Sequence, residues 1–237
     1  MLVAAAFVPA TPLLNPDVAA GAAFELDDLR VACSAAIAAL LAAEPSEIVI
    51  VGLAPRTGPY PVDAQASFSG FGVGSDSAAV SVLPAALSVG RWVLESAAAV
   101  SDAAAPMPTQ CFGVTRQDSS QRCADLGRAL ADRSDRVGVL VVGDGSACRS
   151  PKAPGAFDSR ASDFDDIWLQ ALDSVDVVAL ADVDLALSEQ LLVAGRAPWQ
   201  VAAAMIPDAA EWVGDLTFRD DPYGVMYAVA TWLRRPA

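Results

Sequence analysis

Reactive side chains gather in one short segment near the middle of the chain, between Gly143 and Cys148. The segment reads Gly-Asp-Gly-Ser-Ala-Cys and directly follows the apolar run Val137–Val142. A buried strand that runs into such a turn places Asp144 and Ser146 at its carboxyl end, where open α/β sheets bind ligands. An ordinary turn explains the pattern equally well, because an aspartate side chain often stabilises the turn it sits in.

The chain of 237 residues contains no histidine, and this absence limits its chemistry more than any motif does. Histidine is the commonest metal ligand and the usual general base near neutral pH. Its absence excludes nucleophiles that an imidazole activates, and iron or zinc sites that need an imidazole ligand. The remaining reactive groups are Asp17, Tyr60, Asp144, Ser146, Cys148 and the weakly supported pair Ser150 and Lys152.

The charge balance is strongly acidic, since 29 Asp and Glu oppose 15 Lys and Arg and give a formal net charge of −14. This charge opposes binding to nucleic acids and docking on anionic membrane surfaces. No apolar run reaches the roughly 18–20 residues of a membrane span, and the first residues lack the basic start of a signal peptide. These features favour a cytoplasmic protein without nucleic-acid or membrane partners, whose four cysteines are free buried thiols.

Four apolar runs of strand length predict the centre of a sheet that would position the reactive segment. The runs at 47–53 and 137–142 are continuous rather than alternating, which is typical of strands covered on both faces. The segment Gly224–Leu233 alternates apolar and aromatic residues, and we expect it to close the sheet. The four predicted central strands are Leu2–Val8, Glu47–Leu53, Gln110–Thr115 and Val137–Val142.

Helical patterns separate these strands, and the alternation predicts a single domain, 1–237, of the α/β class. The expected architecture is a three-layer α/β/α sandwich around a mostly parallel or mixed central sheet. Val175–Leu180 fits either a strand or a helix, and the Gly- and Ser-rich Ser67–Ser81 indicates a long mobile loop over one end of the sheet. We expect helices over Leu26–Leu41, from Pro84 past Leu94, from a cap at Asp118 past Leu130, and over Ser162–Leu172.

Four loop segments give the chain a resemblance to a known family. They are Phe7-Val8-Pro9-Ala10-Thr11-Pro12-Leu13-Leu14, Pro55-Arg56-Thr57-Gly58, Gly143-Asp144-Gly145-Ser146-Ala147 and Ala194-Gly195-Arg196-Ala197-Pro198-Trp199. The first three resemble V-P-H-P-P-L-L, P-H-x-G and G-D-x-S-H of the class III extradiol ring-cleavage dioxygenase B-subunit superfamily, which also contains the Memo proteins. The fourth falls where this superfamily supplies a late Glu or Cys. The resemblance covers nearly the whole chain.

The resemblance implies a metal site whose ligands this chain has lost. In active relatives two histidines and a carboxylate hold Fe(II), leaving open positions for catechol and O₂, and another histidine moves protons. By position, the first iron ligand corresponds to Ala10, the second to Arg56 and the third to Ala194. The catalytic histidine corresponds to Ala147. None of the four side chains keeps the chemistry, so the resemblance implies the fold without the iron cofactor and without ring cleavage.

Arg56 would place a permanent cation where relatives hold iron. A guanidinium binds carboxylates and phosphates through paired hydrogen bonds, so we expect Arg56 to pair with Asp144 or with an anionic ligand. The equally weighted alternative is a loop arginine that faces solvent. The candidate ligand-binding residues are therefore Arg56, Asp144, Ser146 and Arg196.

Three functions fit these observations. The first is a non-catalytic protein that binds a small anionic or aromatic ligand, or that acts as a homodimer or partner subunit. The second is a histidine-free enzyme that uses Asp144, Ser146 and Cys148, with Arg149 lowering the pKa of the thiol. The third is a residual dioxygenase that holds iron through carboxylates alone, although Fe(II) oxygenases depend on imidazole ligands.

Overall fold

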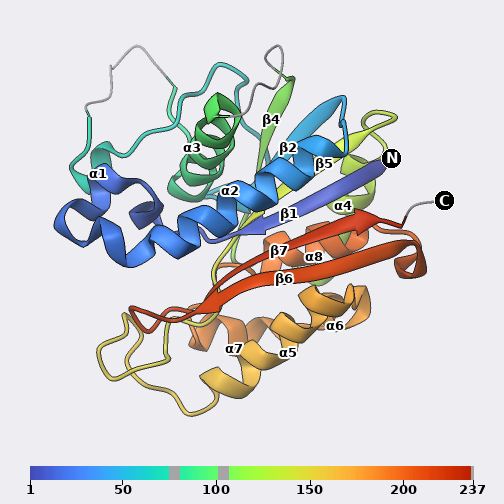
Figure 1. Ribbon diagram of the computed structural model, residues 1–237. Helices are drawn as coiled ribbons and strands as arrows, with labels where there is room; N and C mark the ends of the chain where they lie inside the picture. The colour runs from blue at the N-terminus through green and yellow to red at the C-terminus, as the bar shows by residue number, and fades with distance from the viewer. Residues whose placement is uncertain (75–80, 101–106, 236–237) are drawn as a thin grey trace.

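The computed structural model describes residues 1–74, 81–100 and 107–235, and it shows one mixed sheet between two layers of helices (Figure 1). Within these residues the strand order is β3-β4-β2-β5-β1-β7-β6. The central strands β4, β2, β5 and β1 are parallel, whereas β3, β7 and β6 pair antiparallel to their neighbours. The strands are β1 (Leu2–Val8), β2 (Glu47–Leu53), β3 (Gly58–Pro59), β4 (Thr109–Val114), β5 (Val137–Val142), β6 (Trp212–Asp220) and β7 (Tyr227–Arg234).

Helices cover both faces of the sheet, which confirms the predicted three-layer α/β/α architecture. Alternate residues of β1 point to opposite layers: Ala4 and Ala6 pack with α2 and α3, whereas Ala5 and Phe7 pack with α5 and α8. Every residue of β1 and β5 is buried, which explains their unbroken apolar sequences. The helices are α1 (Pro16–Ala19), α2 (Asp27–Ala42), α3 (Ala85–Val100), α4 (Ser120–Ala131), α5 (Ala161–Ser174), α6 (Val177–Ala181), α7 (Leu185–Gln190) and α8 (Arg196–Ala204).

The amino end of α4 differs from the prediction. Ser119, not Asp118, caps the helix, and its side-chain oxygen accepts a hydrogen bond from the backbone N–H of Arg122 at 3.2 Å. The carboxylate of Asp118 is engaged elsewhere, because it accepts hydrogen bonds from the hydroxyl of Thr57 and from the backbone N–H of Thr115. Asp118 therefore joins the loops that follow β2 and β4.

The carboxyl-terminal hairpin β6–β7 closes one side of the sheet. The expected sheet-closing segment is β7, which lies antiparallel beside β1, while β6 was not predicted. Trp232 on β7 anchors the hairpin, since its ring lies 4.5 Å from that of Phe7 and its Nε1–H donates to Leu172 at 2.7 Å. The ambiguous segment at 175–180 forms the short helix α6, and residues 75–80 of the expected mobile loop lie outside the described residues.

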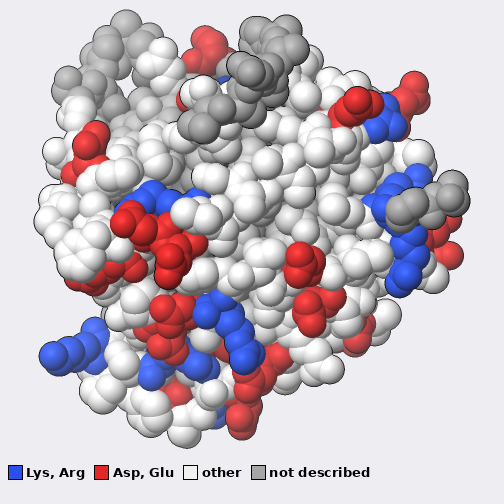
Figure 2. Space-filling view, viewed as in Figure 1, with Lys and Arg blue, Asp and Glu red and all other residues white. Residues whose placement is uncertain are grey.

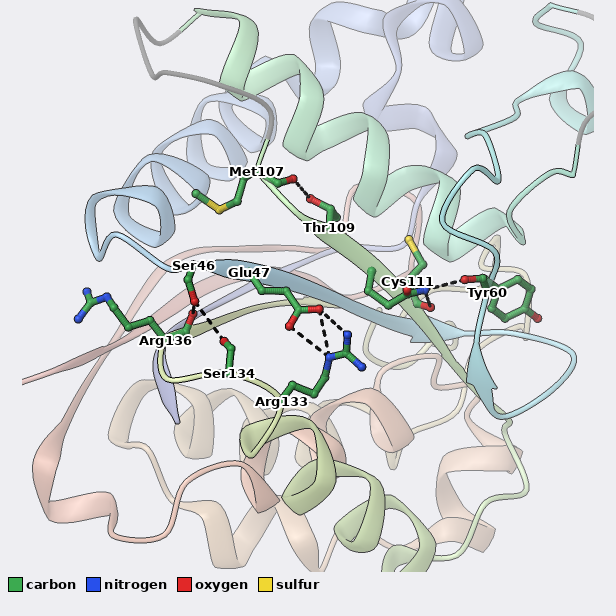
Figure 3. A network of polar contacts seen from close by, with 10 residues as sticks. Ser46, Glu47, Tyr60, Met107, Thr109, Cys111, Arg133, Ser134 and Arg136 are labelled. Atoms are coloured by element: carbon green, nitrogen blue, oxygen red, sulfur yellow. Dashed lines mark hydrogen bonds and ion pairs between the residues drawn. The ribbon is translucent and has the colours of Figure 1, made fainter.

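Polar side chains close the amino ends of the central strands (Figure 3). Glu47, at the start of β2, accepts hydrogen bonds from Arg133, with Nε and Oε1 3.1 Å apart. Ser46 donates through its hydroxyl to the carbonyl of Arg136 at 3.0 Å, and its oxygen lies 3.2 Å from that of Ser134. These contacts tie β2 to the segment that leads into β5 at the amino end, opposite the end where the reactive segment lies.

The surface mixes acidic and basic side chains around a broad uncharged area on the face where α2 lies (Figure 2). Val31 and Ala38 of α2 are exposed, and 69% of the Val31 surface is accessible to solvent. Within the described residues, no helix has both the length and the apolar character needed to cross a bilayer.

Candidate functional site

A cleft opens at the carboxyl ends of β1, β2 and β4, and we call it the carboxyl-end cleft. Its volume is about 560 Å³, and it is open to solvent. The carboxyl ends of parallel strands are the usual ligand-binding edge of an α/β sheet. Its lining comes from the loops after β1, β2 and β4 and from the first turn of α3: Ala10, Leu53, Ala54, Pro55, Pro84, Ala85, Ala86, Thr115, Arg116 and Gln117.

Two other cavities lie away from this edge. One of about 550 Å³ is at the amino end of β1. There the guanidinium of Arg136 donates to the carbonyls of Ala43 and Glu44, and Arg234 forms an ion pair with Glu211. The other, of about 330 Å³, is bordered by Arg149, which pairs with Asp221 at 2.7 Å. Neither of these two cavities is lined by a residue of the four resemblance segments, whereas Ala10 and Pro55 line the carboxyl-end cleft. The carboxyl-end cleft is therefore the candidate site.

Asp144 brings together two of the positions at which iron ligands are expected. Its carboxylate accepts a hydrogen bond from the backbone N–H of Ala10 at 2.7 Å. Its carbonyl accepts from the backbone N–H groups of Ala194 at 3.1 Å and Gly195 at 2.8 Å. A side chain at Gly143 would collide with the Cα of Gly195, so glycine there lets the two loops approach. Ala10, Asp144 and Ala194 are thus neighbours, as the resemblance implies.

The environment of Asp144 disfavours its charged form. Burial raises the pKa of this carboxyl to about 7, although the hydrogen bond from Ala10 acts in the opposite direction. Tyr227 is also buried, next to the buried Thr11, and its pKa is raised by burial and by the negative charge of Asp144. No ion pair involves Asp144 among the described residues. Asp144 therefore holds the loop after β1 in place at the cost of a poorly solvated carboxylate.

Arg56 does not occupy the position that was predicted for it. The residue is exposed, its guanidinium lies 4.2 Å above the ring of Tyr60, and it forms no ion pair with Asp144. The strand order explains the difference: the turn after β2 leads to β3, which pairs with β4, whereas Asp144 follows β5 on the other side of β2. The predicted Arg56–Asp144 pair is wrong, and the solvent-facing alternative is correct, with a cation–π contact added.

Ser146 and Cys148 do not join Asp144 in one reactive cluster. Ser146 is fully buried, and its hydroxyl donates to Asp165 on α5 at 2.5 Å while its backbone N–H donates to the same carboxylate at 2.9 Å. Cys148 is buried beside Gly155, and burial raises the pKa of its thiol. Arg149, which was expected to lower that pKa, pairs with Asp221 instead. The predicted ligand-binding role of Ser146 is therefore corrected to a structural one.

Ala147, the position of the family's catalytic histidine, is also buried and structural. Its backbone N–H donates to Leu191, and its carbonyl accepts from Gly155, each at 2.9 Å. Only 8% of its surface is accessible. Ala147 is not among the residues that line the carboxyl-end cleft.

Arg196 is an internal brace rather than a ligand-binding group. It is 2% exposed and donates to the carbonyls of Arg116 at 2.6 Å and Asp118 at 2.9 Å, and to the side chain of Gln200 at 2.8 Å. Burial lowers the pKa of this guanidinium. These partners use its hydrogen-bonding capacity inside the protein, and they fix the loop that follows β4.

Arg116 is the functional candidate that sequence reasoning missed. It is half-buried, lines the carboxyl-end cleft, and donates through Nη1 to the carbonyl of Val193 at 2.5 Å. Its backbone carbonyl is held by Arg196. Its position directly after the predicted strand Gln110–Thr115 was the available signal, because residues at that point border the ligand-binding edge of a parallel sheet.

The residues present do not fit the Fe(II) site that the resemblance implies. Of the three ligand positions, Ala10 and Ala194 carry only methyl groups, and Arg56 carries a cation that lies over the ring of Tyr60. Among residues 1–74, 81–100 and 107–235, no three His, Cys, Asp or Glu side chains lie close enough together to hold a metal ion. A site of two imidazoles and a carboxylate cannot be assembled from this chain.

Comparisons with known proteins support the fold and go no further. The crystal structure of the uncharacterized protein JW3007 from Escherichia coli K12 matches with a TM-score of 0.57 and 14% sequence identity, over 98% of this chain and 99% of that chain. No family model and no curated protein matches the sequence. At this level of identity, the structural match shows a shared fold alone.

Proposed function

We propose that this chain is a class III extradiol dioxygenase-like protein that has lost iron-dependent ring cleavage and binds a small molecule in the carboxyl-end cleft without converting it. The proposal combines the sequence resemblance with a cleft at the edge of the sheet where ligands of α/β proteins bind. The strongly acidic chain favours a small ligand over a nucleic acid.

One observation supports a binding role above all: the side chains that line the carboxyl-end cleft can hold a molecule but offer no nucleophile or general base. Alanine, leucine and proline form its walls, and its polar groups are those of Thr115, Arg116 and Gln117. Thr115 is engaged with Asp118, and an arginine stays protonated at neutral pH. The chemically reactive side chains, Ser146 and Cys148, are buried and do not line the cleft. This arrangement favours binding over catalysis.

A thermal-shift screen with aliphatic acids, aromatic acids, nucleotides and phosphates tests this function. A ligand that binds only the folded state raises the melting temperature. The variant Ala85→Trp, at an exposed position in the cleft wall, should remove the shift without unfolding the protein. Ala38→Trp, at an exposed position on α2, is the matched control and should keep the shift. A shift that survives Ala85→Trp, or the lack of any shift across the screen, would contradict a binding role and favour a scaffold or partner subunit.

Metal analysis and oxygen consumption test the loss of ring cleavage. Protein purified after growth with added iron should contain far less than one iron per chain, and it should consume no oxygen above background when catechol is supplied. Stoichiometric iron together with catechol-dependent oxygen uptake would refute the loss and restore the residual dioxygenase.

A further inference from the structure

Charge at the carboxyl-end cleft runs opposite to charge over the rest of the chain. The sequence has 29 acidic and 15 basic residues, yet the single charged side chain among the described residues that line this cleft is Arg116. An acidic protein that keeps only a guanidinium at the wall of a cleft makes that cleft a favourable place for an anion.

The guanidinium of Arg116 is held in position and still has donors to spare. Its Nη1 donates to the carbonyl of Val193, and that is the hydrogen bond the structure gives this side chain within the described residues. A guanidinium has five N–H donors in a planar fork. Its other two guanidinium nitrogens form no hydrogen bond with the described residues, and neither is buried, so both are accessible to solvent. A positioned fork with free donors suits a carboxylate or phosphate group.

The neighbouring carboxylates do not neutralise Arg116. Burial alone would raise the pKa of Asp118, but hydrogen bonds from Thr57 and Thr115 and the charge of Arg122 outweigh it and hold that pKa below its usual value. Asp118 is ion-paired with Arg122, with Nε and Oδ1 3.1 Å apart. Asp144 is hydrogen-bonded to Ala10 and lies outside the cleft lining. In the two other cavities, Arg136, Arg234 and Arg149 are already paired or hydrogen-bonded. The fourth arginine there, Arg219, shares its cavity lining with Asp166, Asp220 and Asp221, so carboxylates outnumber the arginines in that cavity.

The other walls of the cleft are apolar and indicate what the rest of the ligand is made of. Leu53 and the prolines and alanines on either side present aliphatic surface, and none of the described lining residues has an aromatic ring. The amino end of α3, a helix of 16 residues, forms one wall, and its dipole has the same sign as Arg116. An aliphatic body can contact these walls while its anionic end meets the guanidinium.

We propose that the carboxyl-end cleft binds a small monocarboxylate with an aliphatic or alicyclic body, and that Arg116 is the residue that recognises the carboxylate. The inference rests on the proposed function, because it assigns a ligand class to the same cleft. It goes beyond that function in replacing a general small-molecule site with a charge-selective one.

Calorimetric titration with cyclohexanecarboxylate and with its neutral isostere cyclohexanecarboxamide tests the inference. The acid should bind about tenfold more tightly than the amide, as expected for the loss of a charge-assisted hydrogen bond. Arg116→Gln should bring the affinity for the acid down to that for the amide, and Arg116→Lys should keep part of the preference. Arg128→Gln, at an exposed arginine on α4 that pairs with Asp125, is the matched control and should bind like the original protein.

The outcomes separate the inference from the proposed function. Equal binding of acid and amide, with both lost in Ala85→Trp, would overturn the role of Arg116 and leave the cleft as a small-molecule site. No binding of either compound by the folded protein would overturn the ligand class. A failed ligand screen in addition would overturn the proposed function. Unfolding curves of Arg116→Gln establish that any lost affinity does not come from a lost fold, and a preference kept by folded Arg116→Gln contradicts the inference.

Discussion

Asp144 links three parts of the chain that are far apart in sequence. Its carboxylate fixes the loop after β1 through Ala10, and its carbonyl fixes the loop before α8 through Ala194 and Gly195. No cation among the described residues compensates its charge. A poorly solvated carboxyl group destabilises the folded protein more when it is ionised than when it is protonated, because burial disfavours the charged form. The residue that organises this edge of the sheet therefore lowers stability as the pH rises.

We predict that Asp144→Asn increases stability above pH 7 and has little effect at pH 4. In the folded protein the pKa of Asp144 is about 7, against 3.8 for a free side chain. Between these values the unfolded chain has lost a proton that the folded chain keeps, so stability falls as pH rises through this window and stays low above it. An asparagine still accepts the hydrogen bond from Ala10 and carries no charge.

Urea unfolding of both proteins at pH 4.5 and pH 8 measures this effect. We expect a gain of about 2 kcal/mol at pH 8, less than the full linkage value of roughly 4 kcal/mol, because the residue is partly exposed. Asp163→Asn, at an exposed carboxylate in the first turn of α5, is the control and should show no such gain at pH 8. The same difference between Asp144→Asn and the original protein at both pH values would contradict the prediction.

The sequence predicted which residues meet at the strand ends better than it predicted what each does. Ala10, Asp144 and Ala194 meet because all three follow strands or loops at one edge of the sheet, which a strand pattern can reveal. The directions of Arg56 and Arg196 could not be predicted, because they depend on strand order and on partners distant in sequence. Arg56 follows its turn toward β4, and Arg196 finds the carbonyls of the β4–α4 loop.

Among the elements, the four longest helices, α2, α3, α4 and α5, and the parallel strands were predictable because each has one dominant pattern. The short helices α1, α6, α7 and α8 were not assigned from the sequence. The continuous apolar runs became β1, β2, β4 and β5 with ends within one residue of the prediction. β6 was missed although Trp212, Gly214 and Leu216 alternate with exposed positions, because polar residues interrupt it and leave no continuous apolar run like those of the central strands. As an edge strand it is partly exposed, and packing against α5 decides its conformation.

Packing between α4 and α8 depends on one glycine, and we predict that Gly127→Ala destabilises the protein. A Cβ at this position would collide with the carbonyl oxygen of Val201 and lie 2.8 Å from the Cβ of Ala204. In an open helix, the same substitution would gain about 1 kcal/mol. Here the overlap forces two helices apart, and we expect a net loss of about 1–3 kcal/mol.

Gly21→Ala is the matched control, because a Cβ there would have no neighbour within 4 Å and its φ is negative. It should change the free energy of unfolding by less than about 1 kcal/mol, with a small gain from the restricted unfolded chain. Urea unfolding of both variants checks the prediction. Equal stability of the two variants would show that α4 and α8 can separate without cost.

At the scale of the whole molecule, the sheet separates a polar, closed amino end from a carboxyl end with an open cleft. Glu47 and Arg133 close the first, while small residues and the guanidinium of Arg116, which forms no ion pair within the described residues, border the second. Between them, two apolar layers hold the sheet and enclose all four cysteines. The reactivity of the thiols therefore measures whether the core of the protein is intact. It also tests the alternative of a cysteine-based enzyme.

We predict that the native protein resists thiol reagents until it unfolds as a whole. Cys33, Cys111, Cys123 and Cys148 are each at most 2% exposed, and burial raises the pKa of every one, to about 12 for Cys33 and about 11 for Cys123. Because the thiolate is the reactive form, neither access nor ionisation favours attack at pH 7.5. Labelling should wait for the opening of the core and should follow the unfolding equilibrium.

An aromatic disulfide reagent should therefore titrate no thiol within minutes in buffer and four per chain in guanidinium chloride. In Cys148→Ser the reagent should titrate three thiols per chain in denaturant and none in the native protein. One thiol that reacts rapidly in the native protein and disappears in Cys148→Ser would mean that the loop after β5 opens readily. That result would favour the histidine-free enzyme over the binding protein, because a catalytic cysteine must be both reachable and ionised.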